Sequence, residues 1–262
     1  MEVVILPDAA AVARVGADVV EAVVRGRPAP VLGLATGSSP VPLYRELARR
    51  HREAGLSFAA TRAFLLDDYV GLAPDHPQRY AAVIRRDFAA GVDLPDDALD
   101  WPHGDAPDLP AECRRYEAAI AAAGGVDLQI LGIGADGHLA FNEPGSSLSS
   151  RTRAKTLTAR TREDNARFFG SVAEVPLHVV TQGLGTILEA RQLLMVATGD
   201  AKAGPIARAV EGPVSAACPA SVLQLHQRAT VLLDQAAAAN LEHREHYEQV
   251  WAARPAWQTW SA

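Results

Sequence analysis

The chain has 262 residues, of which 48% are hydrophobic and 21% are charged, and its formal net charge is −6. This length fits one large α/β domain, or at most two small ones, with ample material for a core. The negative charge disfavours general nucleic-acid binding, because the phosphate backbone would be repelled. An anionic ligand would therefore need positive side chains that are gathered locally.

Cysteine usage and apolar runs indicate the compartment. Cys113 and Cys218 are far apart and have no metal-like spacing, which predicts reduced, buried thiols. The N-terminal sequence MEVVILPDAA lacks the basic stretch and long apolar run of a secretory signal. No apolar run reaches the roughly 18 residues that a membrane span needs. We therefore expect a cytoplasmic protein without a membrane partner.

Apolar runs and helix signals alternate along the chain. Strands are predicted at residues 3–6, 31–35, 62–66, 126–133, 176–180, 191–197 and 229–233. Helices are predicted at residues 9–25, 40–54, 76–89, 110–123, 181–189 and 235–251, with a further one beginning near residue 202. Asp8, Ser39 and Asp234 are the expected N-caps of three of them. This alternation predicts a single-domain α/β fold, a Rossmann-like, mostly parallel sheet with helices on both faces.

Residues 91–108 are rich in Pro, Asp and Gly and are expected to form a long connection, not a domain boundary. At the other end of the chain, Trp257 and Trp260 lie in a short tail. Such large apolar side chains predict that the tail docks on the body of the protein or on a partner chain.

Residues 131–144, LGIGADGHLAFNEP, form the densest group of candidate site residues. A predicted strand runs into a glycine-rich loop that carries Asp136, His138 and Glu143. An acid, an imidazole and a second acid thus follow a strand, where α/β enzymes present proton-transferring groups. The alternative is a surface turn whose polar residues only cap the backbone.

Three other candidate groups also follow predicted strands. The turn at residues 36–39 precedes a helix, so its N–H groups and hydroxyls form a natural anion site. Asp67 and Asp68 end another strand, where two adjacent carboxylates tend to raise the pKa of one of them. Lys202 opposes the dipole at a helix N-terminus, which indicates another task. The alternative for the turn at residues 36–39 is that it only caps the helix. The alternative for the two aspartates is that they are loop acids that cap the next turn, and for Lys202 that it points into solvent.

A basic stretch at residues 146–167 follows the glycine-rich loop, with only Glu163 and Asp164 as local counter-charge. It contains Arg151, Arg153, Lys155, Arg160, Arg162 and Arg167. The stretch is either a solvated surface or the positive patch that a phosphorylated ligand needs. There is no Cys/His metal framework and no dinucleotide-binding fingerprint. Together these features predict proton-transfer chemistry on a small phosphorylated substrate, with no cofactor required.

Several segments resemble the glucosamine/galactosamine-6-phosphate isomerase family, and within it the glucosamine-6-phosphate deaminases. They are VLGLATGSSP, LLDDYVGL, AECRRYE, LGIGADGHLAFNEPGSSLSSRTRAKTLT, TREDNARFF and LQLH. The resemblance covers nearly the whole chain, and GHLAFNEP followed by SRTR is its most specific part. It implies conversion of glucosamine 6-phosphate and water to fructose 6-phosphate and ammonia in amino-sugar catabolism, without a cofactor.

The resemblance also implies roles for individual residues. Asp67 is expected to be the base that moves a proton between C2 and C1. His138 is expected to assist opening of the pyranose ring, held and tuned by Asp136 and Glu143. The phosphate site is expected to consist of Thr36, Gly37, Ser38, Arg167 and Lys202. The sequence departs from the family in GSSP, where GGTP is frequent, and in Asp-Asp, where Asp-Glu is frequent.

Some members of the family are hexamers that N-acetylglucosamine 6-phosphate activates at a site between subunits. The residues that match this site are Ser146, Arg153, Lys155 and Thr156. The aromatic residue that the family contributes near its C-terminus has no clear match, although Tyr247 is close. The resemblance thus implies a homo-oligomer and allows allosteric activation.

Three alternatives remain open from the sequence. Two are enzymes of the same fold, a galactosamine-6-phosphate deaminase/isomerase and a 6-phosphogluconolactonase. The third is a non-enzymatic sugar-phosphate sensor domain, which the acidic charge and the absence of a DNA-binding helix-turn-helix in this sequence disfavour.

Overall fold

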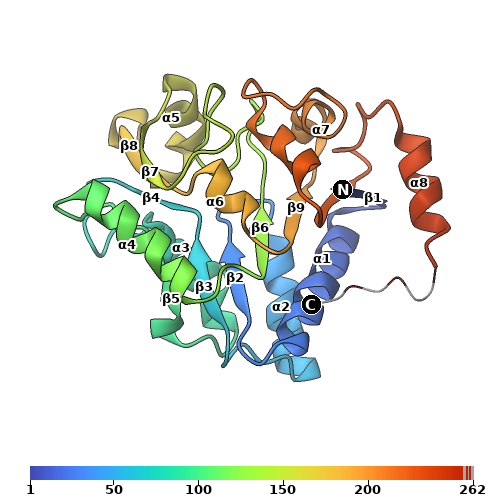
Figure 1. Ribbon diagram of the computed structural model, residues 1–262, viewed down its shortest axis with the longest axis horizontal. Helices are drawn as coiled ribbons and strands as arrows, with labels where there is room; N and C mark the ends of the chain where they lie inside the picture. Colours follow the sequence, from blue (N-terminus) through green and yellow to red (C-terminus); the bar gives the residue numbers. More distant parts are fainter. Residues whose placement is uncertain (256–257, 259, 261–262) are drawn as a thin grey trace.

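The computed structural model describes residues 1–255, 258 and 260, and its centre is a seven-stranded sheet (Figure 1). The strand order is β1-β10-β9-β6-β2-β3-β5, and every pair of neighbours is parallel. The strands are β1 (Glu2–Leu6), β2 (Val31–Leu34), β3 (Arg62–Leu65), β5 (Leu99–Asp100), β6 (Leu128–Leu131), β9 (Leu193–Ala197) and β10 (Ala229–Asp234). The predicted α/β class with a mostly parallel sheet is confirmed.

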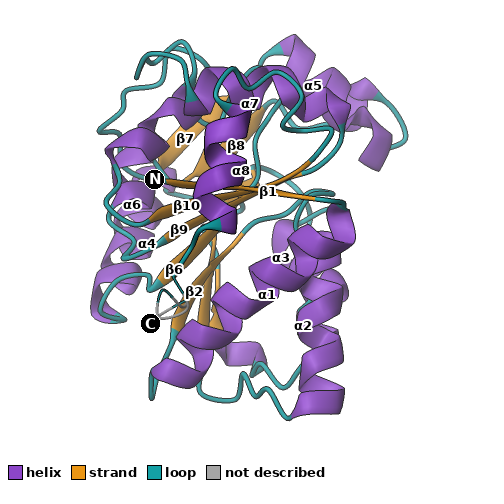
Figure 2. Ribbon diagram, turned by 90° about the vertical axis from the view of Figure 1, so that its right-hand side faces the viewer, coloured by secondary structure: helices purple, strands orange, loops and turns teal. Residues whose placement is uncertain are grey.

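Right-handed crossovers determine which face each helix covers. The chain moves in one direction along the sheet from β1 to β5 and returns through β6, β9 and β10. The outward path carries α1 (Ala9–Gly26), α2 (Val41–Ala54) and α3 (Tyr80–Asp87), and the return path carries α4 (Leu109–Ala122), α6 (Leu184–Leu188) and α7 (Ala203–Val210). The two sets lie on opposite faces of the sheet (Figure 2). Central strands such as β6 and β9 are consequently buried along their whole length.

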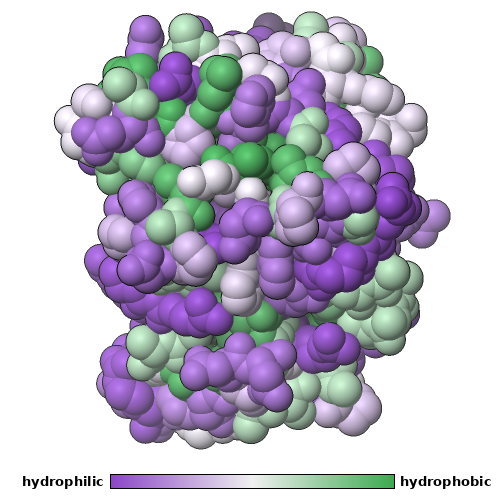
Figure 3. Space-filling view, turned by 90° about the vertical axis from the view of Figure 1, so that its left-hand side faces the viewer, coloured by the Kyte–Doolittle hydropathy of each residue, from purple (hydrophilic) through white to green (hydrophobic). Residues whose placement is uncertain are grey.

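A second, three-stranded antiparallel sheet lies beside the main one (Figure 1). It consists of β4 (Asp67–Tyr69), β8 (His178–Thr181) and β7 (Arg153–Thr156), in the order β4-β8-β7. The sequence predicted residues 67–69 as the end of the preceding strand. The chain instead leaves the main sheet after Leu65 and pairs with β8, so that Asp67 lies opposite Thr181. The surface on this side of the molecule is mostly hydrophilic, with smaller apolar patches (Figure 3).

Three predicted helix starts are wrong. Ser39 does not cap α2, which begins at Val41 after Pro40 and has no side-chain cap. The helix α3 begins at Tyr80, not at residue 76. Asp234 does not start a long helix, because its carboxylate accepts the N–H groups of Gly199 and Ala237 and the following residues form turns. The C-terminal helix is only α8 (Arg244–Ala252).

Other expectations at the ends of the chain are confirmed. The Asp8 carboxylate caps α1 by accepting the N–H of Ala11 at 2.7 Å. In the C-terminal segment, the Arg254 guanidinium lies 4.1 Å from the ring centroid of Trp251 and 5.3 Å from that of Trp260. Trp260 packs on the main core, so the tail docks on the body at this residue, whereas Trp257 lies outside the described residues.

None of the helices within the described residues has the length and apolar character needed to cross a membrane. Both cysteines are buried and free, as expected.

Candidate active site

The carboxyl ends of four neighbouring strands bring the predicted site residues together. The strands β9, β6, β2 and β3 are adjacent in the sheet. They lead, in that order, to Lys202, the loop at 131–144, the turn at 36–39 and Asp67. The connection after β2 turns to one face of the sheet and the connection after β6 to the other. The carboxyl ends of these two strands therefore lie at the topological switch point of the sheet, where open α/β sheets bind ligands.

His138 is held at this edge by its neighbours in the loop. Asp136 Oδ1 lies 2.7 Å from His138 Nδ1, an ion-pair contact bent away from a linear hydrogen bond, and accepts the backbone N–H of His138 at 3.1 Å. Burial alone would raise the pKa of Asp136, but its contacts with the ring and the backbone N–H of His138 lower it to about 2. The ionised carboxylate thus favours a proton on Nδ1 and leaves Nε2 as the acceptor.

The imidazole fits because residue 134 is glycine. A Cβ atom at Gly134 would lie 2.2 Å from Cε1 and 2.3 Å from Nε2 of His138. Such distances do not occur between real atoms, so any side chain at residue 134 would push the ring aside. Glycine at residue 134 is therefore required by close packing of the ring on the backbone.

Glu143 lies in the same loop but is bonded elsewhere. It is 6% exposed, and its carboxylate accepts hydrogen bonds from the Thr158 N–H at 3.3 Å, from the Thr158 hydroxyl at 3.0 Å and from the Thr161 hydroxyl. Glu143 therefore ties the loop to the start of α5 (Ala159–Asn165), where Thr158 is the N-cap. The hydrogen bonds of the Glu143 carboxylate within the described residues go to Thr158 and Thr161, so that Glu143 holds and tunes His138 stays a prediction. Thr158, three residues before Thr161 at a helix start, is an N-cap signal that the sequence analysis missed.

Asp67 and Asp68 are adjacent in β4 and point to opposite sides of the strand. Asp68 is fully buried, forms an ion pair with Arg79 Nε at 3.1 Å and accepts the N–H groups of Tyr69 and Tyr80. Asp67 is 5% exposed, and burial together with the negative charge of Asp68 raises its pKa well above the usual range. A carboxyl group with raised proton affinity is suited to taking up and returning a proton.

Two cations lie near the His138 loop. Lys202, in the turn η5 (Asp200–Lys202), is half-buried and donates from Nζ to the Ile133 carbonyl at 2.7 Å. Burial lowers the pKa of Lys202, and the positive charge of Arg167 lowers it further. Arg167 lies in η3 (Ala166–Phe168) and is exposed. Because each cation senses the other, a shared anion would relieve their repulsion.

The turn after β2 completes this edge of the site. Gly37 has a φ of +97°, which favours glycine, and Gly37 and Ser38 are exposed while Thr36 is half-buried. The turn leads directly into the N-terminus of α2, where free N–H groups and the helix dipole favour an anion.

The residues matched to the regulatory site lie in β7 of the second sheet and just after the His138 loop. Arg153 and Lys155 are alternate, half-buried residues of β7, whose exposed Thr156 lies with its hydroxyl 3.2 Å from His178 Nδ1. Ser146 is buried. The basic stretch also has more counter-charge than expected, because Arg151 pairs with the distant Glu117 and Glu189.

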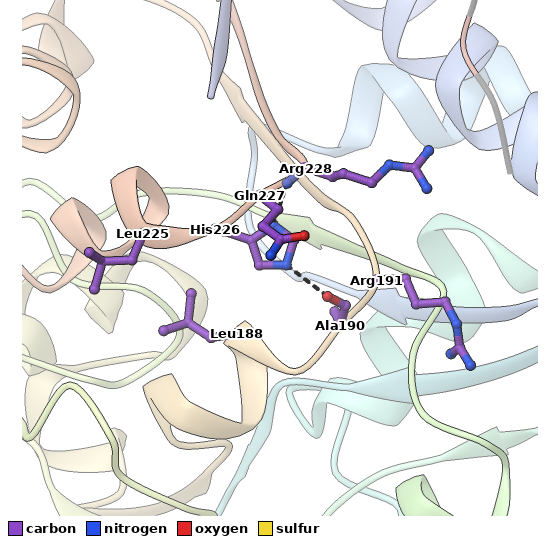
Figure 4. Close-up of a pocket in the computed structure, with 7 residues that line it drawn as sticks. All are labelled: Leu188, Ala190, Arg191, Leu225, His226, Gln227 and Arg228. Atoms are coloured by element: carbon purple, nitrogen blue, oxygen red, sulfur yellow. Dashed lines mark hydrogen bonds between the residues drawn. The ribbon is translucent and has the colours of Figure 1, made fainter.

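A hollow of about 370 Å³ opens at the opposite edge of the sheet, where the chain enters β9 and β10 (Figure 4). It is lined by Leu188, Ala190, Arg191, Leu225, His226, Gln227 and Arg228. His226 Nε2 lies 2.8 Å from the Ala190 carbonyl oxygen and closes one side of it. None of the predicted site residues lines this hollow, so it is separate from the candidate active site. Within the described ranges, no cluster of three or more His, Cys, Asp and Glu side chains could hold a metal ion.

Comparisons with known proteins agree on one family. Residues 8–232 match the family model of glucosamine-6-phosphate isomerases/6-phosphogluconolactonase. A protein from Rhodococcus jostii (strain RHA1) is 58% identical over 99% of this chain and 100% of its own length. A protein from Arthrobacter sp. (strain FB24) is 57% identical over 98% of this chain and 99% of its own length. Both are named glucosamine-6-phosphate deaminase.

Solved structures support the same grouping. A monomeric glucosamine-6-phosphate deaminase, 40% identical, superposes with a TM-score of 0.89 over 92% of this chain and 100% of that chain. The 6-phosphogluconolactonase from Thermotoga maritima, 19% identical, superposes with a TM-score of 0.70 over 89% of this chain and 98% of that chain. The second likeness shows a shared fold alone.

Proposed function

The chain belongs to the family of glucosamine-6-phosphate isomerases and 6-phosphogluconolactonases, and we propose that within it the chain is a glucosamine-6-phosphate deaminase. Residues 1–262 act as one catalytic domain that converts glucosamine 6-phosphate and water to fructose 6-phosphate and ammonia. The high identity to relatives named for this activity, set against the low identity to the lactonase structures, supports this choice.

The first step is opening of the pyranose ring. His138 Nε2 accepts the proton of the anomeric hydroxyl and delivers it to the ring oxygen, which gives the open-chain aldehyde. Asp136 stabilises the imidazolium that forms in between, because its carboxylate lies 2.7 Å from Nδ1. Glu143 acts on this step indirectly, since it fixes the loop against α5.

The second step is proton transfer between C2 and C1. Asp67 removes the C2 proton and its electron pair forms the C1–C2 double bond. The C1 carbonyl π bond breaks as O1 takes up a proton that the C2 ammonium group gives up, which yields an enolamine. The same carboxyl group returns the proton to C1, where the C1–C2 π pair takes it up, and the nitrogen lone pair forms the C2=N bond of an iminium. Water then adds to C2 and ammonia departs, giving the ketone of fructose 6-phosphate. The raised pKa of Asp67 supports this role, because a shuttle must both bind and release the proton.

The phosphate anchors the other end of the substrate. Thr36, Gly37 and Ser38 would bind it at the α2 N-terminus, and Lys202 and Arg167 would supply positive charge. In a chain with a net charge of −6, this local concentration of cations makes binding of a sugar phosphate favourable.

The observation that carries the proposal is the meeting of a phosphate turn, a proton-shuttling acid and a held histidine at adjacent strand ends. The test is turnover of three substrates by the purified protein. Glucosamine 6-phosphate should release ammonia, whereas galactosamine 6-phosphate and 6-phosphogluconolactone should react at least about tenfold more slowly. Preference for galactosamine 6-phosphate, or hydrolysis of the lactone without ammonia release, would identify one of the two related enzymes instead.

The assembly and regulation of the protein are a separate part of the proposal. We infer a cytoplasmic homo-oligomer that N-acetylglucosamine 6-phosphate activates through Ser146, Arg153, Lys155 and Thr156. The buried Ser146 hydroxyl has no hydrogen-bond partner among the described atoms, which supports a ligand at this position. Sedimentation and rate curves with and without the activator test this part. A monomer with hyperbolic, unchanged kinetics would contradict it, and the monomeric relative is a precedent for that outcome.

A further inference from the structure

Two buried tyrosine hydroxyls meet the backbone where β2 and β3 end. Tyr44, in α2, is 1% exposed, and its hydroxyl donates to the Ala35 carbonyl at 2.7 Å and accepts the Ala35 N–H at 3.1 Å. Tyr116, in α4, is fully buried, and its hydroxyl donates to the Leu65 carbonyl. The two helices lie on opposite faces of the sheet (Figure 2). Each face thus supplies one tyrosine to one strand end.

Tyr44 holds both ends of the turn at residues 36–40. Ala35 follows β2 directly and precedes Thr36, so its polar backbone groups are beyond the sheet ladder and need other partners. The Tyr44 hydroxyl satisfies both of them. The backbone N–H of Tyr44 donates to the Pro40 carbonyl at 3.0 Å, at the far end of the turn. The two ends of the turn are therefore bonded to one residue.

Tyr116 acts at the neighbouring strand end. Leu65 is the last residue of β3, and Asp67 begins β4 two residues later. The Leu65 carbonyl also accepts the side-chain amide of Gln182 at 3.0 Å, and the Leu66 carbonyl accepts the Gln182 backbone N–H at 2.7 Å. These bonds fix the chain where it leaves the main sheet, just before the carboxyl group of Asp67.

We propose that Tyr44 and Tyr116 are positioning residues with separate tasks, Tyr44 for the phosphate-binding turn and Tyr116 for Asp67. The tasks assigned to the turn and to Asp67 rest on the proposed function. Neither tyrosine touches the substrate, and each acts through one backbone segment.

The hydroxyls can be removed without removing the rings. The Tyr44 ring packs against Phe88 with centroids 5.0 Å apart, and the Tyr116 ring packs against Phe64 with centroids 5.9 Å apart. Tyr44→Phe and Tyr116→Phe keep these aromatic contacts and delete one buried oxygen each. Each variant is therefore the matched control of the other.

The experiment measures kcat, KM and inhibition by inorganic phosphate for both variants, with thermal unfolding to show that each is folded. For Tyr44→Phe we expect KM and the phosphate inhibition constant to rise about fivefold, with kcat within about twofold of the wild-type value. For Tyr116→Phe we expect kcat to fall about tenfold while KM and the phosphate constant stay within about twofold.

A purely structural role predicts a different outcome. The proposal is overturned if both variants are less stable than wild type but keep its kcat, KM and phosphate inhibition constant. It is also overturned if the two variants show the same changes in kcat and in KM. Binding of inorganic phosphate, measured by calorimetry without turnover, separates this proposal from the proposed function. Weaker phosphate binding by Tyr44→Phe alone would support the Tyr44 task even if glucosamine 6-phosphate proved not to be the substrate. A wild-type protein that binds no phosphate would overturn it.

Discussion

At the scale of single residues, the surroundings of each carboxyl group separate their chemical roles. Asp136 has its pKa lowered to about 2 beside His138, whereas burial and the charge of Asp68 raise that of Asp67. Acids whose environments push their pKa values apart are typical of proton-transfer sites. The sequence could predict these residues because motif and strand position indicate them. It could not predict that Glu143 binds Thr158 and Thr161, because that contact depends on how α5 folds back.

Replacing Asp67 by Asn should stabilise the protein while abolishing its activity. The native pKa of Asp67 lies above the 3.8 of an exposed aspartate, so between these two values the folded state binds more protons than the unfolded state. The stability of the wild type therefore falls as the pH rises through this window, and Asn removes that penalty. Near pH 7 we expect the free energy of unfolding of Asp67→Asn to exceed that of wild type by on the order of 1 kcal/mol. This difference corresponds to a melting temperature that is higher by about a few degrees. Equal melting temperatures from pH 4 to pH 8 would contradict this.

Asp136→Asn should have the opposite pH signature. The native pKa of about 2 lies below the usual 3.8, so the charge of Asp136 stabilises the fold above pH 3.8 and this contribution is lost as the pH falls towards 2. The free energy of unfolding of the wild type should exceed that of the variant by about 1–2 kcal/mol at neutral pH, allowing for solvent screening. Near pH 2 this difference in unfolding free energy should be much smaller. Urea unfolding at several pH values measures this. The kcat should fall about 100-fold because His138 loses its orienting partner.

At the scale of elements, long apolar runs were predictable and short, charged strands were not. The strands β2, β6, β9 and β10 carry enough adjacent apolar residues to be recognised. In contrast, β5 has two residues within a stretch rich in Pro and Asp, and β7 reads RAKT within the basic segment. Their pairing depends on partners far along the chain, such as Val180 for Ala154.

The glycines of the 131–144 loop provide a test with an internal control. A Cβ at Gly134 would collide with the His138 ring, whereas a Cβ at Gly132 would have no atom within 4 Å. Gly134→Ala should therefore lower kcat by about 10- to 100-fold through displacement of the ring. Gly132→Ala should keep kcat within about twofold. Steady-state kinetics of both variants measure this difference in kcat. An equal fall of kcat in the two variants would contradict the explanation by contact with the His138 ring.

At the scale of the whole molecule, the site lies where the strand order reverses: the chain passes from β2 to β3 on one side and from β6 to β9 on the other. Alternation of strands and helices predicted the parallel sheet but not its strand order, which fixes which loops become neighbours. The prediction that the candidate groups meet at one edge followed from parallel strands alone. The switch from the main sheet to β4, which carries Asp67, required the structure.

The two edges of the sheet should respond differently to loss of a cation. Lys202 lies at the carboxyl edge and Arg191 in the hollow at the opposite edge. Lys202→Met should raise KM about tenfold or more by removing a charge near the phosphate. Arg191→Met should leave KM within about twofold, although it loses bonds to Gly124 and Asp127 and some stability. Inhibition by inorganic phosphate should likewise weaken more in Lys202→Met than in Arg191→Met. A larger rise of KM in Arg191→Met than in Lys202→Met would contradict the placement of the phosphate at the carboxyl edge of the sheet.

The most direct test of the account is the product balance of wild type and Asp67→Asn at saturating glucosamine 6-phosphate. Ammonia and fructose 6-phosphate are measured together over time. The account predicts that wild type releases the two products in equal amounts and that folded Asp67→Asn releases neither above background. Wild type that releases no ammonia, or Asp67→Asn that releases both products at the wild-type rate, would contradict it.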